Sequence, residues 1–294
     1  MGAYAAAKAK ISPLLHTYEI GVAMAKTGMT LGILGGCGPA AGAHFYTRLV
    51  ALTKAEGDHG HVDVLLTGRA STPDRTAYLL DGGENPATYL AADAKILQNS
   101  GADLLVLLCH TAHAFLAEIR AAVSIPVLDM VSLTVDYAAA RGLTTLGILS
   151  TQGTHHARLY DRAAAPYGMH VMYPAPETRM LVQSCIYGFL KQGRQDGGAA
   201  IRTACADLGA RGCPAVVLAC TELSLPIAQP HAPLYYRRRA PIAFLPQALI
   251  DPLEILARRA ITLCGKQVKE EEQDAAAFFA CGSARCQAAG NRHG

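Results

Sequence analysis

Two cysteines occupy matching places in the two halves of this chain. Cys109 follows the apolar run 104–108 and Cys220 follows the apolar run 215–219, and a threonine follows each cysteine within two residues. Short apolar runs of this kind indicate buried strands, so each thiol is expected at a strand's carboxyl end, where the next helix opens. Two such halves facing one ligand could remove a proton from one face of a carbon and return one to the other.

Thiols suit this chemistry because they can act as acid or base near neutral pH. The pKa of a free thiol is about 8.5, and the start of a helix lowers it. A single buried cysteine is usually structural, but equivalent placement in two halves favours catalysis by Cys109 and Cys220. The other cysteines that lie in helix or strand patterns are predicted core residues: Cys185, Cys205, Cys213 and Cys264.

The elements that must position these thiols alternate along the chain. Strands are predicted at 30–35, 62–67, 103–108, 145–149, 169–172, 214–219 and 241–245. Helices are predicted at 39–55, 86–100, 111–122, 131–140, 154–165, 177–191, 196–210 and 247–263. The alternation predicts an α/β fold with parallel sheets and right-handed crossovers, with ligands at the carboxyl ends of strands.

An internal repeat suggests how the chain divides. Residues 30–38 and 145–153 share the pattern Thr-Leu-Gly-Ile-Leu followed by a glycine loop, which predicts two similar domains with a boundary near 126–130. The predicted division is an N-terminal extension at 1–28, a first domain at 29–126 plus 234–264, a second domain at 127–233, and a tail at 265–294. The extension and the tail are expected to be disordered.

Composition excludes several classes of protein. The 294 residues are 51% hydrophobic and 17% charged, with a net charge of +3. This charge is too small to argue for nucleic acid or an acidic membrane surface, and no run of about 18 apolar residues predicts a membrane span. Nine cysteines without a clear secretory signal favour a reducing cytoplasm.

A glycine-rich loop follows the first predicted strand. Gly36 and Gly38 allow the backbone to approach a ligand, and the helix that opens at Pro39 offers free N–H groups to an anion. The G-x-G-x-x-G spacing of dinucleotide sites is absent, so an anion site or a tight turn is favoured. Cys37, within the loop, could be a third thiol of the site, but a role in filling space is favoured.

Other charged and ligating residues have more than one interpretation. Arg75, after Asp74, could hold a carboxylate through two hydrogen bonds, or form a surface ion pair. His113 could face the cleft or be a structural histidine with its hydrogen bonds satisfied. His59 and His61 lack a nearby third ligand, so no metal site is predicted.

Four ordered segments resemble the aspartate/glutamate racemase family. These are Leu-Gly-Gly-Cys-Gly-Pro at 34–39, Pro-Asp-Arg-Thr at 73–76, Cys-His-Thr-Ala-His at 109–113 and Ala-Cys-Thr-Glu-Leu at 219–223. Asp251-Pro252 before the last helix also matches, and the resemblance covers about residues 30–264. It implies a racemase of amino acids that needs no cofactor, with two Rossmann-like domains facing an active-site cleft, usually as a homodimer.

The resemblance also implies roles for residues. Cys109 and Cys220 match the two catalytic thiols, Arg75 matches an arginine for the substrate carboxylate, and Lys191 matches an active-site lysine of aspartate racemases. His110 stands where the family commonly has an asparagine that helps to hold the α-carboxylate. The remaining residues of the expected substrate site are Thr111, Thr221, Glu222, Gly36 and Gly38.

Two alternatives stay open at this point. A decarboxylase or a cis–trans isomerase of the same superfamily would also use a cleft thiol, although having both Cys109 and Cys220 favours racemisation. A non-catalytic protein that binds a small acid is the other alternative, and His110 is the residue that supports it.

Overall fold

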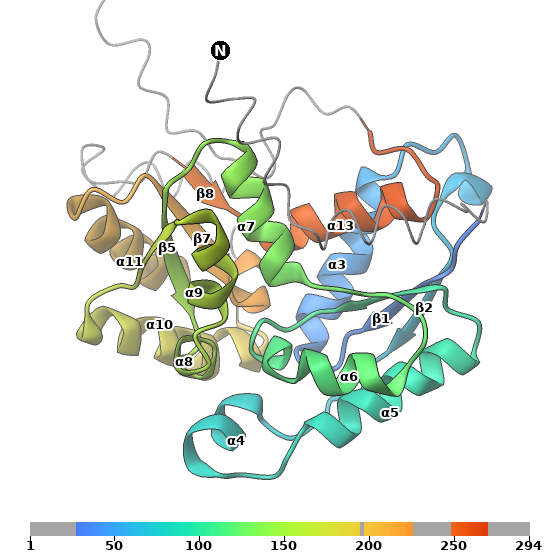
Figure 1. Ribbon diagram of the computed structural model, residues 1–294, viewed down its shortest axis with the longest axis horizontal. Helices are drawn as coiled ribbons and strands as arrows, with labels where there is room; N and C mark the ends of the chain where they lie inside the picture. The colour runs from blue at the N-terminus through green and yellow to red at the C-terminus, as the bar shows by residue number, and fades with distance from the viewer. Residues whose placement is uncertain (1–27, 195–196, 226–247, 270–294) are drawn as a thin grey trace, which may run out of the picture.

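The computed structural model describes residues 28–194, 197–225 and 248–269, and two four-stranded parallel sheets form its framework (Figure 1). The first sheet has the order β2-β1-β3-β4 and the second the order β6-β5-β7-β8. The strands are β1 (Leu31–Leu34), β2 (Val64–Thr67), β3 (Leu104–Leu107), β4 (Val127–Leu128), β5 (Thr145–Ser150), β6 (His170–Met172), β7 (Ala215–Ala219) and β8 (Ala248–Ile250). The predicted α/β class with parallel sheets is confirmed.

Helices connect the strands and cover both sheets. The α-helices are α3 (Pro39–Leu52), α4 (Arg75–Asp81), α5 (Ala87–Asn99), α6 (Leu116–Ala122), α7 (Met130–Ala140), α8 (Gln152–His156), α9 (Leu159–Ala164), α10 (Pro176–Gly188), α11 (Gly198–Ala210) and α13 (Pro252–Leu263). Short 3₁₀ helices are η1 (Asp58–Gly60), η2 (Thr111–Phe115), η3 (Ala165–Tyr167), η4 (Leu190–Gln192) and η5 (Thr221–Ser224). Among the described residues, no helix is long and apolar enough to cross a membrane.

The strand order places the ends of particular strands together. In the first sheet the chain runs from β1 to β2 on one side and returns to β3 on the other. The second sheet repeats this with β5, β6 and β7. Open parallel sheets bind ligands where the strand order reverses, at the carboxyl ends of the strands. This point lies between β1 and β3 in the first sheet and between β5 and β7 in the second.

The end of the chain differs from the sequence prediction. The predicted strand 241–245 lies outside the described residues, and the helix predicted from 247 begins only at Pro252. Asp251 directly follows β8 and caps α13 by accepting a hydrogen bond from the Leu253 N–H at 2.9 Å. β8 pairs with β7, so residues 248–250 extend the second sheet and do not complete the first.

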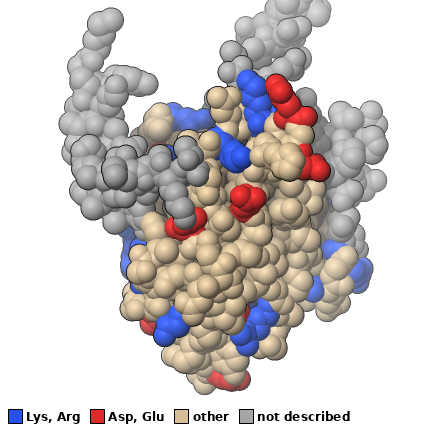
Figure 2. All heavy atoms as spheres, turned by 90° about the vertical axis from the view of Figure 1, so that its right-hand side faces the viewer, with Lys and Arg blue, Asp and Glu red and all other residues tan. Residues whose placement is uncertain are grey.

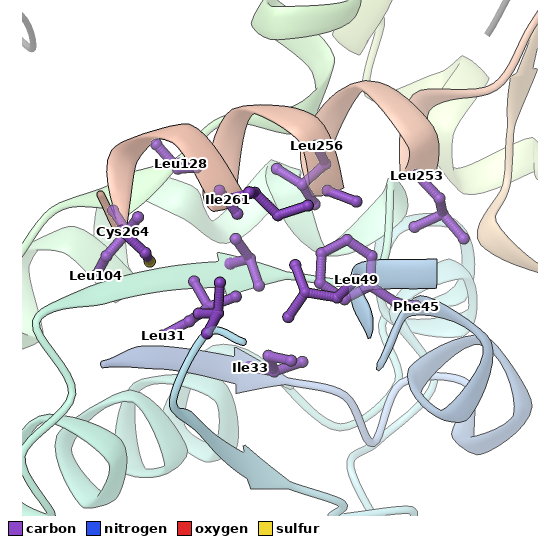
Figure 3. Close-up of a cluster of buried hydrophobic side chains, with 14 of the residues drawn as sticks. Leu31, Ile33, Phe45, Leu49, Leu104, Leu128, Leu253, Leu256, Ile261 and Cys264 are labelled. Atoms are coloured by element: carbon purple, nitrogen blue, oxygen red, sulfur yellow. The ribbon is translucent and has the colours of Figure 1, made fainter. Parts of the chain in front are cut away.

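Helix α13 nevertheless covers the first sheet. Leu253, Leu256 and Ile261 point from α13 toward β1 and β3, beside side chains of α3 (Figure 3). Burial of such side chains is worth roughly 25 cal/mol per Å² of apolar surface. Residues 265–269, predicted to belong to the tail, are instead held by backbone hydrogen bonds. The Lys54 N–H donates to the Gln267 carbonyl, and the Lys269 N–H donates to the Leu52 carbonyl.

Three predicted helices are interrupted. The segment 111–122 divides into η2 and α6. The segment 154–165 divides into α8 and α9 at Arg158, whose φ of 50° lies in the left-handed region. The segment 177–191 ends as α10 at Gly188, so Lys191 belongs to η4 rather than to a helix end.

Charged side chains are dispersed over the face shown in Figure 2, which is the right-hand side of Figure 1. Lys, Arg, Asp and Glu occur there in small groups separated by uncharged surface. The described residues in this view form no continuous basic surface of the kind that binds nucleic acid.

Gly32 in β1 tests the packing of the first sheet. A Cβ at this position would lie 2.4 Å from Leu105 Cδ2 and 2.9 Å from Ala102 Cβ. We expect Gly32→Ala to lower the free energy of unfolding by about 1–3 kcal/mol, because the core must shift to admit a methyl group. Gly57→Ala is the control, since nothing lies within 4 Å of its Cβ position. Urea denaturation at unchanged m-value measures both, and equal midpoints would contradict this packing.

Candidate active site

A small cavity lies between the two sheets, at the carboxyl ends of the strands between which the strand order reverses. Its walls come from Cys37, Arg75, Thr76, Cys109, His110, Thr111, Thr151, Tyr187, Lys191, Cys220, Thr221 and Glu222. The volume open to the centre of a water molecule is about 10 Å³, which suffices for roughly one water. The structure therefore brings most predicted site residues together around a closed space.

Gly36 and Gly38 are the predicted site residues that do not line this cavity. A Cβ at Gly36 would lie 2.4 Å from the backbone of Arg69, and one at Gly38 would lie 2.4 Å from Glu222 Oε1. Both glycines are packed closely against neighbouring segments, and their substrate contact stays a prediction. Gly38 also brings the first half of the chain against Glu222 of the second.

Arg75 is buried at the start of α4, in contrast to a surface ion pair. Its Nη1 donates to the carbonyls of Thr72 at 3.3 Å and Pro73 at 3.1 Å, and Nη2 donates to that of Cys37 at 2.9 Å. Three of the five guanidinium N–H groups are thereby used, leaving two for a thiolate or a carboxylate. The arginine is fixed in position before any ligand binds.

Cys109 lies two residues after β3 in a positively charged environment. A hydrogen bond from the Cys37 thiol holds the pKa of Cys109 well below its usual value, and the charges of Arg75 and Lys191 act in the same direction. The Ala112 N–H in η2 also bonds to the sulfur, and together these interactions outweigh burial, which opposes ionisation. The surroundings of Cys109 therefore favour its thiolate form.

Cys220, directly after β7, is in the opposite state. Burial and the charge of Glu222 raise the pKa of Cys220 well above its usual value. The thiol donates to Glu222 Oε2 at 3.1 Å, and Thr221 Oγ1 donates to the same oxygen at 3.0 Å. Glu222 Oε1 is buried without a hydrogen-bond partner among the described residues. In one cavity, the surroundings thus favour the thiolate form of Cys109 and the thiol form of Cys220.

His110 is buried between the two halves. Its ring stacks on Tyr160 of α9, with centroids 6.0 Å apart and planes at 28°. Burial, reinforced by His113, holds the pKa of His110 well below its usual value, so the imidazole is neutral. The residue lines the cavity, and neither ring nitrogen has a hydrogen-bond partner among the described residues.

His113 has a structural role. Met130 N–H donates to His113 Nε2 at 3.1 Å. The proton is therefore on Nδ1, which donates to the Cys109 carbonyl at 2.8 Å. Both ring nitrogens are satisfied, and they attach the Cys109 backbone to the start of α7.

Lys191 reaches the cavity from η4. Its Nζ lies 3.7 Å from Asp74 Oδ2 and 4.3 Å from the centre of the Tyr187 ring. The Tyr187 hydroxyl donates to Asp74 at 3.0 Å. Asp74 in turn caps α4 by accepting from the N–H groups of Thr76 and Ala77. This network joins the second half of the chain to the arginine-bearing helix of the first.

Three threonine hydroxyls make another connection between the halves. Thr111 Oγ1 lies 2.8 Å from Thr151 Oγ1 and 3.0 Å from Thr154 Oγ1. A Cβ at Gly153, between these two, would lie 2.8 Å from Thr111 Cγ2. Thr111 is thus engaged with α8, so an incoming ligand must compete with these hydrogen bonds.

Sequence reasoning missed several cavity residues. Thr151 and Tyr187 received no role, although Thr151 directly follows β5 and the repeat aligns it with Gly36, a predicted site residue. Cys37 was predicted to fill space but lines the cavity. Cys185, Cys205, Cys213 and Cys264 are free, buried core residues as predicted. The described residues contain no group of three or more His, Cys, Asp or Glu able to hold a metal ion.

Comparison with known proteins agrees with this geometry. A family model described as Asp/Glu/Hydantoin racemase matches residues 34–260. The chain belongs to this family.

Individual relatives are more distant. The broad specificity amino-acid racemase RacX of Bacillus subtilis (strain 168) is 25% identical over 146 residues, which cover 49% of this chain and 63% of that protein. The aspartate racemase of Picrophilus torridus is 28% identical, with a TM-score of 0.68 over 82% of this chain and 96% of that one. A putative Asp/Glu racemase from Yersinia pestis, 23% identical with a TM-score of 0.63, covers 80% of this chain and 99% of its own, and shows the shared fold.

Glu222→Gln tests the electrostatics at Cys220. Removing the negative charge that opposes the thiolate should lower the pKa of Cys220, by about one unit if the charge contributes about 1.4 kcal/mol. The measurement is the pH midpoint of iodoacetamide alkylation, followed at each cysteine by peptide mass spectrometry. Cys109 in the same sample is the control. An unchanged Cys220 midpoint would show that Glu222 does not hold the proton on this thiol.

Proposed function

We propose that this protein is a racemase of aspartate or glutamate that works without pyridoxal phosphate and uses Cys109 and Cys220 as its two bases. The observation that supports the proposal is the presence of both thiols in one small cavity, with surroundings that shift their pKa values in opposite directions. A racemase needs a base on one face of the substrate carbon and an acid on the other. The family membership of the chain is consistent with this chemistry.

The mechanism follows from the proton positions. The Cys109 thiolate removes the Cα proton of one enantiomer, and the Cys220 thiol donates its own proton to the opposite face. Cys109 is then a thiol and Cys220 a thiolate, which is the arrangement needed for the other enantiomer. During the transfer, Arg75 and Lys191 stabilise the carboxylate charge that increases as the carbanion develops.

The cations of the cavity favour an acidic substrate. Arg75 and Lys191 both line it, and each can attract a carboxylate. The neutral His110 imidazole has both nitrogens unpartnered among the described residues and can bond to a substrate carboxylate as a donor. The similarity to an aspartate racemase supports the same substrate class.

Substrate entry requires the halves to separate. The cavity has room for about one water molecule, whereas an amino acid needs several times this volume. The Thr111 and Lys191 contacts between the halves would open first, and closure over the substrate would exclude water from the carbanion. We also propose that the protein is a homodimer and that it acts in the cytoplasm. Light scattering tests the dimer.

Single cysteine variants test the two-base mechanism. We expect Cys109→Ala and Cys220→Ala each to abolish racemisation, because turnover needs both an acceptor and a donor of protons. The remaining thiol should still exchange the Cα proton of one enantiomer without inversion. Proton NMR in deuterium oxide, combined with chiral chromatography, measures exchange and inversion separately. Cys205→Ala, a buried cysteine outside the cavity, is the control and should keep both activities.

Other outcomes would contradict the two-base mechanism or favour a different function. Full racemisation by either variant, or equal exchange of both enantiomers by each, would refute the two-base mechanism. Binding of aspartate or glutamate by the wild-type protein without exchange would favour the acid-binding protein. Loss of carbon dioxide from the substrate would favour the decarboxylase.

His110→Asn tests the role of the histidine in recognition. We expect the ranking of amino-acid substrates by kcat/KM to change by about tenfold or more, because one lost hydrogen bond to a charged group is worth roughly 1.5–3 kcal/mol. The midpoint of urea denaturation should change less, since the ring makes no hydrogen bonds with the described residues. The same ranking and rates in variant and parent would place His110 out of contact with the substrate.

A further inference from the structure

A second cavity, the α8 pocket, opens beside α8 at the carboxyl ends of β5 and β6. Its volume open to the centre of a water molecule is about 590 Å³, within the range of about 300–1,000 Å³ typical of small-molecule sites. Open parallel sheets bind their ligands at such strand ends. The walls of the α8 pocket include Leu80, Ser150, Arg158, Asp161, Tyr173 and Arg179.

The α8 pocket is distinct from the candidate active site. Of the residues that line it, only Thr151 also lines the small cavity that holds Cys109 and Cys220. Leu80 of α4 contributes a wall from the first half of the chain, where α4 packs against α8 (Figure 1).

We propose that the α8 pocket binds a small organic anion: Arg158 and Arg179 hold its carboxylate or phosphate group, and apolar side chains of the pocket cover its body. This site is independent of the proposed racemase function.

Arg179, on α10, lacks a negatively charged partner in the pocket. Its Nη1 lies 3.0 Å from Nε2 and 3.2 Å from Nδ1 of His155, and an imidazole brings no negative charge. Its Nε is buried without a hydrogen-bond partner among the described residues. A guanidinium carries five N–H donors, and a carboxylate or phosphate supplies both the acceptors and the charge that it lacks here.

Arg158, between α8 and α9, presents the second cation. Its φ of 50° makes it the one non-glycine residue with positive φ in the described part of the chain. A left-handed backbone is uncommon for a residue with a Cβ, and such residues cluster at ligand sites. The Arg158 side chain is 74% exposed, and its contact with Asp161 Oδ1 is a long one of 3.5 Å.

The charges that line the α8 pocket do not balance. Asp161 is the only carboxylate among the lining residues, against two arginines. Its Oδ2 already accepts a hydrogen bond from the Tyr173 hydroxyl at 2.6 Å. The remaining positive charge attracts an anion into the pocket.

The other walls suit a ligand with an apolar body. Leu80 and Met180 are exposed and line the pocket together with Pro174. The Tyr173 ring is held edge-on by His155, with centroids 4.3 Å apart. Apolar walls with a few convergent polar groups are typical of sites for small organic molecules, whereas an inorganic ion would use the arginines alone.

Calorimetric titration of the full-length protein with phenyl phosphate and with benzoate tests the α8 pocket. Each probe joins an apolar ring to one anionic group, and the tighter probe identifies the preferred group. Phenol, which has no such charge, should bind at least about tenfold more weakly. We expect Arg158→Gln and Arg179→Gln each to weaken binding of the tighter probe by about tenfold or more, because a hydrogen bond to a charged group is lost. Lys95→Gln, which removes an exposed cation from α5, is the matched control and should bind as the wild type does.

Four results would overturn the inference. These are no binding of either anion at about 1 mM, phenol binding as tightly as the anions, and unchanged affinity in both arginine variants. The fourth is loss of binding in Arg75→Gln with normal binding in both pocket variants, which would place the probe in the small cavity. Because Arg158 is exposed, Arg158→Gln keeps the test decisive should Arg179→Gln fail to fold.

Discussion

The buried guanidinium of Arg75 is the charge around which the first half of the site is built. A cation removed from water must be compensated by hydrogen bonds and by negative charge. Three backbone carbonyls, those of Thr72, Pro73 and Cys37, supply the hydrogen bonds, and the charge of Arg75 in turn lowers the pKa of Cys109. The same side chain therefore fixes two loops and favours the ionised form of a sulfur.

Two similar sheets produce an asymmetric site. Both present a cysteine at the point where the strand order reverses, yet Cys109 faces cations and Cys220 faces the Glu222 carboxylate. A proton-transfer reaction between two faces of a carbon requires this inequality, because two thiols or two thiolates could not act as acid and base together. The repeat provides the positions, and the side chains around them provide the difference.

The site is complete only when the halves are in contact. Thr111 with Thr151, and Lys191 with Asp74, join elements that lie far apart in the chain. The resulting cavity is nearly closed, and exclusion of water strengthens each electrostatic interaction inside it. Under the proposed function, the contacts that shape the electrostatics are therefore also those that break when a substrate enters.

Local sequence determined the α/β class and the positions of Cys109 and Cys220, because apolar runs and the residues that end them depend on near neighbours. The strand at 248–250 was not predicted, because it is three residues long and only its pairing with β7 makes it a strand. Tertiary structure alone decided that Cys37 lines the same cavity as Cys109 and that Lys191 reaches it from a 3₁₀ turn. It also decided in which direction the pKa of each thiol shifts, because that depends on charges and burial contributed by segments far apart in the chain.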